Sequence, residues 1–340
     1  KPPRVRPDDS TPSDFQWFVM EVNYRLDGVV KAAVASAWKD LEDYAHGRSA
    51  PPVVPVLVGG DDLTVYVEGQ FAIPFAESYV RHYEQLTGED ELLRRLAVIA
   101  GSKKAGPLTA SAGVAIVGRN FPFHIAYDLA EGLVSRGKKL GKKKDEAPCS
   151  TIDFHVLRDA TVLNPEETLA EYKGRTQRPF LVGHYAPERI GEATTTSSTA
   201  KSLQTRDQWK EILRTVAVFD GKKPDNPTQT TGDPFPRARA NRIVKLLAEG
   251  EGEKAATEWD YALQNAPSAG RLAKQLKLLP PHSSSSDEAG KALEQIKWLL
   301  DLIDLSENLP DGYLASRIGQ GTDGAGFQET ADDSTEGGAK

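Results

Sequence analysis

Two glycines followed by two aspartates, Gly59, Gly60, Asp61 and Asp62, form the segment of this chain best suited to chemistry. Glycines permit positive φ angles and close backbone approach, and adjacent acids at the tip of a turn direct their carboxylates to opposite sides. One carboxylate can then reach a divalent cation such as Mg²⁺ or Mn²⁺. Taken alone, the tetrapeptide more often marks an ordinary solvated hairpin turn, so the flanking chain must decide.

A basic segment at positions 136–144 suits the same chemistry, because ammonium and guanidinium groups bind phosphate oxygens. Its basic residues are Arg136, Lys138, Lys139, Lys142, Lys143 and Lys144. Such a segment can clamp a triphosphate or an RNA backbone, and it is equally typical of a solvated charge run at a helix C-terminus. Lys138 and Lys139, nearest to the predicted helix, are the candidate phosphate ligands.

Several kinds of active site are disfavoured. The six histidines lack the spacing of a zinc or nuclease site, and the chain has no P-loop, no Gly-x-Gly-x-x-Gly and no Gly-x-Ser-x-Gly. We expect His155, within Ile-Asp-Phe-His-Val, to be a strand residue with a satisfied hydrogen bond rather than a catalyst. The single cysteine, Cys149, excludes an internal disulfide and cysteine-rich zinc sites.

Length and charge set broad limits. A chain of 340 residues is long enough for two folded units, and a formal charge of −7 disfavours a surface that generally coats nucleic acid. No apolar run approaches the roughly 20 residues that cross a bilayer, which predicts a soluble cytoplasmic protein with no membrane partner. The chain starts at Lys1 and its one methionine, Met20, lies inside an apolar run, so we expect the natural N-terminus upstream.

Strands and helices must position these residues. Hydrophobic periodicity predicts strands over 15–22, 53–58, 63–67, 108–117, 150–157 and 178–184, and helices over 26–44, 72–86, 89–100, 122–136 and 165–172. From residue 207 onward, apolar residues recur at helical spacing only, which predicts a second, all-helical unit.

The predicted order β-α-β-β-α-β resembles a ferredoxin-like core, the fold of polymerase palms and nucleotidyl cyclases. The predicted organisation is α+β followed by all-α. Its parts are a linker over 1–14, a palm over 15–190, a linker over 191–204, a helical domain over 205–310 and a disordered tail over 311–340.

In a palm, metal ligands come from the end of the first strand and from the acidic hairpin. The positions available for them are Glu21, Asn23, Asp61 and Asp62. Ser111, in a strand of small residues, would let a base or ribose approach closely, although small residues equally serve tight helix packing.

Four blocks, at 54–65, 109–116, 121–133 and 150–157, resemble the second palm domain of the large subunit of type III CRISPR effector complexes. They read Val-Pro-Val-Leu-Val-Gly-Gly-Asp-Asp-Leu-Thr-Val, Thr-Ala-Ser-Ala-Gly-Val-Ala-Ile, Phe-Pro-Phe-His-Ile-Ala-Tyr-Asp-Leu-Ala-Glu-Gly-Leu and Ser-Thr-Ile-Asp-Phe-His-Val-Leu. The resemblance implies a palm that makes cyclic oligoadenylate from ATP when guide RNA engages target RNA within a multi-subunit complex. The helical region after residue 205 is similar to that family's C-terminal helical domain.

By this resemblance, Asp61 and Asp62 match the family's acidic hairpin, Ser111 its small-residue strand, and Lys138 or Lys139 its phosphate-binding segment. The first strand departs from the family pattern, because Glu21 and Asn23 stand where the family commonly has Asp-x-Asp. The leading hypothesis is a metal-dependent nucleotidyltransferase in which Glu21, Asp61 and Asp62 hold the metal.

Two alternatives remain open. One is a degenerate palm that binds nucleotide or scaffolds an RNA-guided complex, which Asn23 favours because its amide carries no charge. The other is a diguanylate cyclase, which is disfavoured because that family follows its glycines with Asp or Glu, then Glu and Phe, whereas Leu63 follows Asp62 here.

Overall fold

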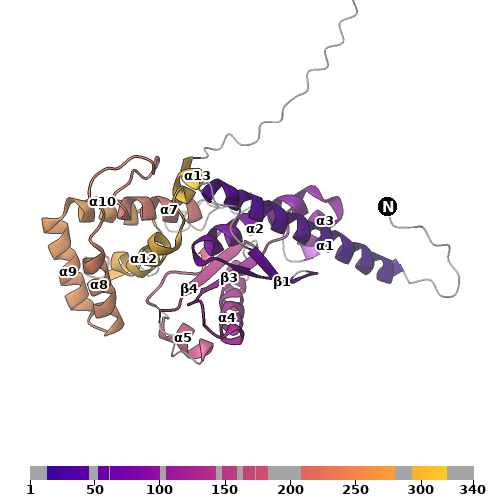
Figure 1. Ribbon diagram of the computed structural model, residues 1–340, viewed down its shortest axis with the longest axis horizontal. Helices are drawn as coiled ribbons and strands as arrows, with labels where there is room; N and C mark the ends of the chain where they lie inside the picture. The colour runs from indigo at the N-terminus through magenta and orange to yellow at the C-terminus, as the bar shows by residue number, and fades with distance from the viewer. Residues whose placement is uncertain are drawn as a thin grey trace, which may run out of the picture.

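The computed structural model describes residues 14–45, 53–60, 62–99, 105–142, 148–158, 164–172, 174–182, 208–279 and 293–319. An α+β part up to residue 182 precedes a helical part that starts at residue 208 (Figure 1). This order confirms the predicted fold class. The predicted linker over 191–204 and residues 1–13 lie outside the described residues.

The chain opens with a single helix, α1 (Asp14–Asp40), so the strand predicted over 15–22 is wrong. Aromatic and β-branched residues favour a strand locally, but residues 15–27 contain no glycine or proline that would stop a helix. The buried stripe of Val30, Ala33, Val34 and Ala37 anchors the helix, which then extends backward through that run. Phe15 is 72% exposed, and the N-terminal end of α1 projects beyond the other helices and strands (Figure 1).

The acidic turn joins two antiparallel strands, as the sequence predicts. β1 (Val53–Gly59) pairs with β2 (Asp62–Val67), with Val53 opposite Val67 and Gly59 opposite Asp62. The register shifts between Pro55 and Leu57, which places a β-bulge in β1. A short 3₁₀ helix, η1 (Leu41–Tyr44), follows α1 before this hairpin.

A second sheet has the order β3-β4-β5. β3 (Ser111–Ile116) and β4 (Thr151–Val156) are parallel and are joined through α4 (Phe123–Gly141), whereas β5 (Phe180–Leu181) is antiparallel to β4. The helix α5 (Pro165–Glu171) begins at Asn164, whose side chain accepts hydrogen bonds from two backbone amides of the first turn.

Glycines let α4 lie directly on this sheet. A Cβ on Gly113 in β3 would stand 2.3 Å from the carbonyl oxygen of Ala130 in α4. A Cβ on Gly137 would stand 2.6 Å from Oγ1 of Thr151. The small residues therefore serve close helix packing, one of the two roles that the sequence leaves open.

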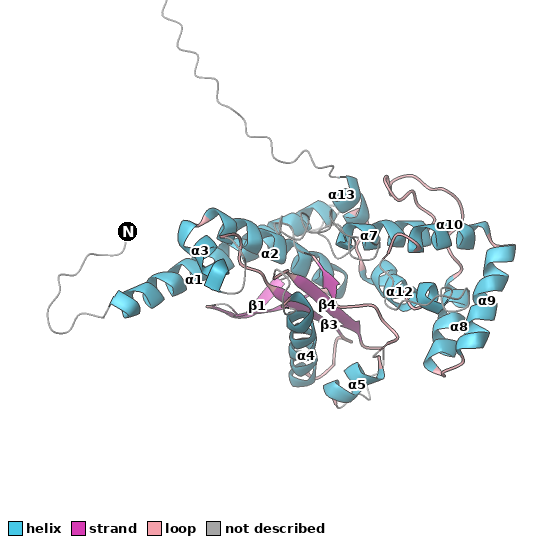
Figure 2. Cartoon of the chain, turned by 180° about the vertical axis from the view of Figure 1, so that it is seen from behind, coloured by secondary structure: helices cyan, strands magenta, loops and turns pink. Residues whose placement is uncertain are grey.

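The opposite face of the same sheet packs on α2 (Gly69–Glu89), which is followed by α3 (Glu91–Ile99). Because strand side chains alternate, Ile152 and Phe154 of β4 point to the side of α2, where both are fully buried. α1 lies alongside α2, and helices thus lie on both sides of the strands (Figure 2).

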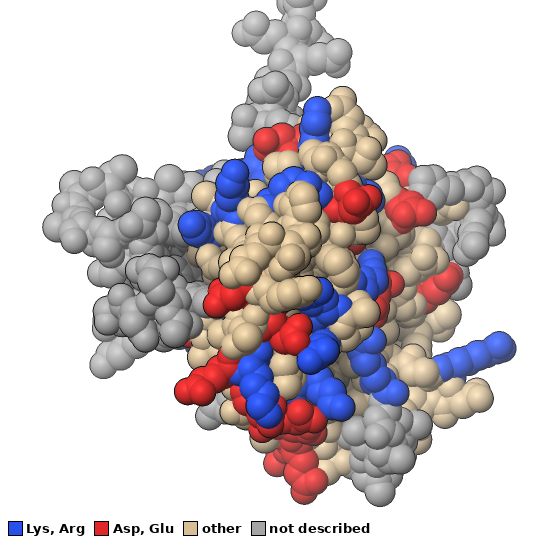
Figure 3. All heavy atoms as spheres, turned by 90° about the vertical axis from the view of Figure 1, so that its left-hand side faces the viewer, with Lys and Arg blue, Asp and Glu red and all other residues tan. Residues whose placement is uncertain are grey.

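The described helical part includes α7 (Gln208–Phe219), α8 (Arg237–Ala248), α9 (Gly252–Asn265), α10 (Pro267–Leu276), α12 (Leu299–Asn308) and α13 (Tyr313–Gly319). The last of these lies within the predicted disordered tail, so that prediction is wrong for residues 313–319. Tyr313, Leu314 and Ile318 are buried, which gives this short segment enough apolar contact to fold. Acidic and basic side chains are interspersed on the end of the molecule formed by α8, α9 and α10 (Figure 3).

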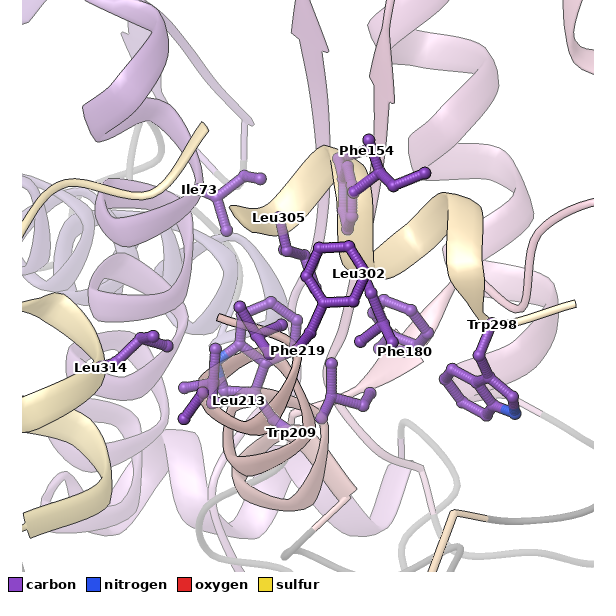
Figure 4. Packing of buried hydrophobic residues seen from close by; sticks show 14 of the residues in the cluster. Ile73, Phe154, Phe180, Trp209, Leu213, Phe219, Trp298, Leu302, Leu305 and Leu314 are labelled. Carbon is purple, nitrogen blue, oxygen red and sulfur yellow. The ribbon is translucent and has the colours of Figure 1, made fainter. Parts of the chain in front are cut away.

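One hydrophobic core joins the palm to the helical part. Phe180 of β5 lies between Trp209 and Trp298 (Figure 4). Its ring centroid is 6.0 Å from that of Trp209 and 5.9 Å from that of Trp298. Ile73 of α2 and Leu302 of α12 belong to the same cluster. The two predicted units therefore pack against each other through shared apolar contacts.

A buried ion network crosses the same junction. The guanidinium of Arg178 donates to Asp301 at 2.6 Å and to Asp304 at 2.7 Å, and it also donates to the carbonyl oxygen of Phe154. Burial raises the pKa of Asp301 to about 6. The Arg178 side chain is only 1% exposed. The free-energy cost of burying its charge is therefore offset by these hydrogen-bonded partners.

Within the described part of the chain, no helix is both long enough and apolar enough to cross a membrane.

Candidate nucleotide-binding surface

The turn between β1 and β2 has the geometry that its glycines predict. Gly60 adopts a φ of 60°, a conformation that favours glycine, and among the described residues other than the chain neighbours no atom lies within 4 Å of a Cβ built on Gly60 or on Gly59. The carboxylate of Asp62 is exposed at the first position of β2. Asp61 lies outside the described residues.

Aromatic side chains extend the face of the hairpin that bears Asp62. Residues two apart share a face of a strand, so Asp62, Thr64 and Tyr66 point the same way. The ring of Tyr66 lies 5.3 Å from that of Phe123 in α4, and Phe123 lies 6.0 Å from Tyr127. Tyr66 and Phe123 are 45% and 43% exposed, which leaves room for a planar ligand to stack.

These aromatic residues are absent from the predicted site. The period-2 alternation of β2 already places Tyr66 with Asp62, but only the packing of α4 brings Phe123 beside it. β2 and α4 also interact electrostatically. The negative charge of Glu131 is the main cause of a raised pKa of Tyr127, and the charges of Asp62 and Asp128 contribute to it.

The basic residues at the C-terminal end of α4 divide into two groups. Arg136 binds the buried carboxylate of Asp153 through two hydrogen bonds of 2.7 Å and 2.8 Å. Burial still raises the pKa of Asp153 above its ordinary value. Arg136 therefore fixes α4 to β4, whereas Lys138 and Lys139 are exposed in the last helical turn. Lys143 and Lys144 lie outside the described residues.

Ser111 stands at the start of β3, beneath α4. Its hydroxyl oxygen accepts a hydrogen bond of 3.0 Å from Thr151, and its Cβ lies 3.6 Å from a Cβ built on Gly137. These contacts show a helix-packing position. A role in nucleotide binding stays a prediction.

Glu21 and Asn23 do not lie on a strand, because both belong to α1. The carboxylate of Glu21 accepts from Arg25 at 2.7 Å, and Arg25 also pairs with Asp90 at 2.8 Å. Asn23 is exposed. The expectation that they end the first strand beside the hairpin is therefore wrong, since the helical stripe of α1 overrides the local strand preference.

The acidic turn and the basic end of α4 lie at the same end of the palm. Val58, just before the turn, packs on the same small cluster as Leu108 and Ala110, which precede β3. A Cβ built on Gly137, one residue before Lys138, would lie 3.6 Å from the Cβ of Ser111 at the start of β3. The structure thus brings together the regions of Asp62, Ser111 and Lys138, and it excludes Glu21 from the strands.

No group of three or more His, Cys, Asp and Glu side chains is placed to hold a metal ion among the described residues. This finding does not include Asp61.

His155 is a strand residue, as predicted, but its expected hydrogen bond is not observed at one nitrogen. Its Nε2 is buried and no described residue hydrogen-bonds to it. Burial lowers the pKa of His155 to about 4, and its ring meets Tyr172 edge-on at 4.5 Å.

An acidic hairpin, a strand crossover and flanking helices define a palm-like α+β domain of the polymerase and nucleotidyl cyclase class. Residues 19–147 match the family model described as Cas10/Cmr2, second palm domain, which includes the hairpin, Ser111 and α4. This segment therefore resembles a Cas10/Cmr2 second palm domain. The match does not extend to the helical part. A search of the curated proteins found no match.

Proposed function

We propose that this palm is a metal-dependent nucleotidyltransferase that binds ATP beside the turn at Gly59 and Gly60 and makes cyclic oligoadenylate. The observation that carries the proposal is that the exposed carboxylate of Asp62 and the exposed ammonium groups of Lys138 and Lys139 belong to the same end of a palm. Phosphoryl and nucleotidyl transfer depend chiefly on positioning and on compensating negative charge, which acids with a metal and lysines together supply.

The donor chemistry of the turn fits Mg²⁺ or Mn²⁺. Mg²⁺ usually keeps several waters and is held by one or two carboxylates plus substrate phosphates, so a site without three described acids is compatible with it. Asp61 and Asp62 would hold the ion, which supplies charge compensation for the phosphates when bound. Glu21 is left out of this set, because its carboxylate is engaged by Arg25 in α1.

The protein's own groups have distinct parts in this proposal. Lys138 and Lys139 would bind the triphosphate through charge-assisted contacts. Tyr66 and Phe123, next to one another on the face of Asp62, would stack on the base. Gly59 and Gly60 leave the backbone of the turn open to the ligand, since nothing occupies the space of a Cβ at either position.

The test uses the full-length protein in its RNA-loaded complex, with ATP or GTP and Mg²⁺ or Mn²⁺, and identifies products by mass spectrometry. We expect pyrophosphate and oligoadenylate from ATP, and a loss of at least about 100-fold in Asp62→Asn. Asp128→Asn is the matched control, because Asp128 is an exposed acid of α4 that also influences Tyr127. An assembly that yields no nucleotide product would contradict the proposal, and products from GTP alone would favour a diguanylate cyclase.

A degenerate palm that binds nucleotide or scaffolds the complex is the second candidate. It is favoured because Glu21 and Asn23 lie in α1. The described strands therefore do not include the predicted first strand, which was expected to supply an acid to the metal site. Asp61→Ala separates the candidates. Loss of metal-dependent ATP binding supports a nucleotide site, whereas unchanged binding and unchanged assembly support a scaffold.

A further inference from the structure

One side of α4 carries three kinds of side chain in order from its N-terminal to its C-terminal end. Phe123, Tyr127 and Glu131 are spaced four residues apart, so they lie one after another along the helix. Lys138 follows Glu131 by seven residues, which is about two helical turns, and returns to the same side. Tyr127 is half-buried and the other three are exposed. We call this row of two aromatic rings, a carboxylate and an ammonium group the α4 column.

The strand β2 lies beside the first turns of the α4 column. The ring of Phe123 contacts both neighbouring rings, since its centroid is 5.3 Å from that of Tyr66 and 6.0 Å from that of Tyr127. From Tyr66, alternate residues of β2 lead toward the acidic turn and end at Asp62. The charge of Glu131 is the main cause of the raised pKa of Tyr127, and that of Asp62 contributes. The middle of the α4 column therefore lies near the acidic end of β2.

The α4 column has the same order as the parts of a nucleotide. In a ribonucleoside triphosphate, the ribose links the base to the phosphates. The proposed function places the base on Tyr66 and Phe123 and the phosphates at Lys138, so the ribose lies between these two positions. Along the helix axis, Glu131 is about 12 Å from Phe123 and about 10 Å from Lys138. Glu131 and the neighbouring Tyr127 therefore stand at the level of the ribose.

The carboxylate of Glu131 is available to a ligand. It is exposed, and none of the described lysine and arginine side chains forms an ion pair with it, whereas Arg136 on the same helix binds Asp153. An ionised carboxylate only accepts hydrogen bonds, and its charge repels the oxygens of a phosphate. A ribose offers hydroxyl groups, which can donate to it. Glu131 is therefore suited to the ribose and not to the triphosphate.

We infer that Glu131 is a specificity-determining residue of this palm, and that its carboxylate accepts hydrogen bonds from the ribose hydroxyls of the bound nucleotide. The ring of Tyr127, one turn earlier in the α4 column, forms the adjacent part of the ribose position. The inference rests on the proposed function, because it takes the positions of the base and the phosphates from it. An acid binds the ribose of the cofactor in the same way in dinucleotide-binding folds.

Isothermal titration of the full-length protein with ATP and with 2′,3′-dideoxy-ATP tests the inference. The analogue has the same base and triphosphate but lacks both ribose hydroxyls. We expect the wild type to bind ATP about 10-fold to 100-fold more tightly than the analogue, as for a hydrogen bond to a charged group. Glu131→Ala should bind the two ligands about equally. The ratio of the two affinities is the readout, because any effect of the Glu131 charge on the triphosphate is the same for both ligands.

Two further variants show whether the acceptor itself is responsible. Glu131→Gln keeps an acceptor oxygen without the charge, and it should retain a preference for ATP of about 2-fold to 10-fold. Asp128→Ala is the matched control, because Asp128 is another exposed acid of α4 but lies three residues before Glu131, outside the α4 column. It should keep the affinity ratio of the wild type. Both acids are exposed, so these substitutions leave the fold intact.

The possible failures are distinguishable. A wild type that binds ATP and the analogue equally, or a Glu131→Ala variant that keeps the wild-type ratio, would overturn the inference while the nucleotide site stands. An equal loss of the ratio in Asp128→Ala would also overturn it, since the general charge of α4 would then be responsible. A wild type that does not bind ATP at all would overturn the proposed function, and the inference with it.

Discussion

The junction around Arg178 and the surface around Asp62 both collect charged side chains, yet they differ in burial. Arg178 and Asp301 are 1% and 0% exposed, and each has hydrogen-bond partners in the other part of the molecule. Asp62, Lys138 and Lys139 are exposed to solvent. Removing one partner of a buried pair leaves an uncompensated charge, whereas exposed charges contribute little to folding.

The difference separates structural charge from charge that is available to a ligand. Arg136 links structural charge to ligand-available charge. Its bidentate bond to buried Asp153 holds the helix that carries the exposed Lys138 and Lys139. Buried pairs of this kind fix the positions of exposed groups, which then need no internal partner. Four predictions test that division, from the largest expected effect to the smallest.

Arg178→Met should destabilise the protein by about 3–5 kcal/mol, since it leaves the carboxylate of Asp301 buried without its cation and removes one of the two guanidinium partners of Asp304. Urea denaturation followed by circular dichroism measures the change. Arg119→Met, at an exposed position, is the control and should alter the free energy of unfolding by less than about 0.5 kcal/mol. Equal stability of the two variants would show that the junction does not depend on this network.

His155 should make the junction sensitive to acid. Its pKa is about 4 in the folded protein, below its ordinary value of 6.5. A buried neutral histidine contributes stability that is complete above pH 6.5 and is lost as the pH falls toward 4, by up to about 3 kcal/mol. His155→Phe keeps a ring against Tyr172 and removes the titration, so this loss should disappear.

The pKa of Asp301, in the ion network of the same junction, affects stability in the opposite direction. Its pKa is raised to about 6, so its contribution to stability is present below its unfolded pKa near 3.8 and declines as the pH rises toward 6. The informative quantity is therefore the difference between wild type and His155→Phe, followed by urea denaturation from pH 7 to pH 4. A difference that does not change with pH would refute the role of His155.

Tyr66→Ala should weaken nucleotide binding by about 1–3 kcal/mol while the fold persists, because it removes one of two exposed stacking rings. Isothermal titration with ATP measures the affinity. Tyr261→Ala is the control, since Tyr261 is also an exposed aromatic residue but lies in the helical part on α9. Similar losses in both variants would place the nucleotide elsewhere.

Asp62→Asn should change the free energy of unfolding by less than about 0.5 kcal/mol, the smallest effect of the four. The carboxylate is exposed at the start of β2, so folding does not depend on its charge. Thermal unfolding without nucleotide is the measurement. A destabilisation comparable to that of Arg178→Met would mean that Asp62 is structural.

Short periodic elements could be predicted from the sequence. The hairpin around Gly60, the strand-helix-strand unit from β3 to β4 and the helices from α7 onward all depend on local patterns of apolar residues, glycine and turn chemistry. The candidate turn and the basic end of α4 were predictable for the same reason. Asp62 and Lys138 lie at the ends of such elements, where spacing alone gives their location.

Only the tertiary structure decided three other features. The run at 15–22 joins α1, because a helix anchored by Val30 and Ala37 continues until a residue stops it, and this removed Glu21 from the predicted strand. Phe123 joins Tyr66 because α4 packs on the sheet through glycines. The division of the described strands into two sheets, β1-β2 and β3-β4-β5, depends on hydrogen bonds between segments far apart in the chain, and no local pattern contains that information.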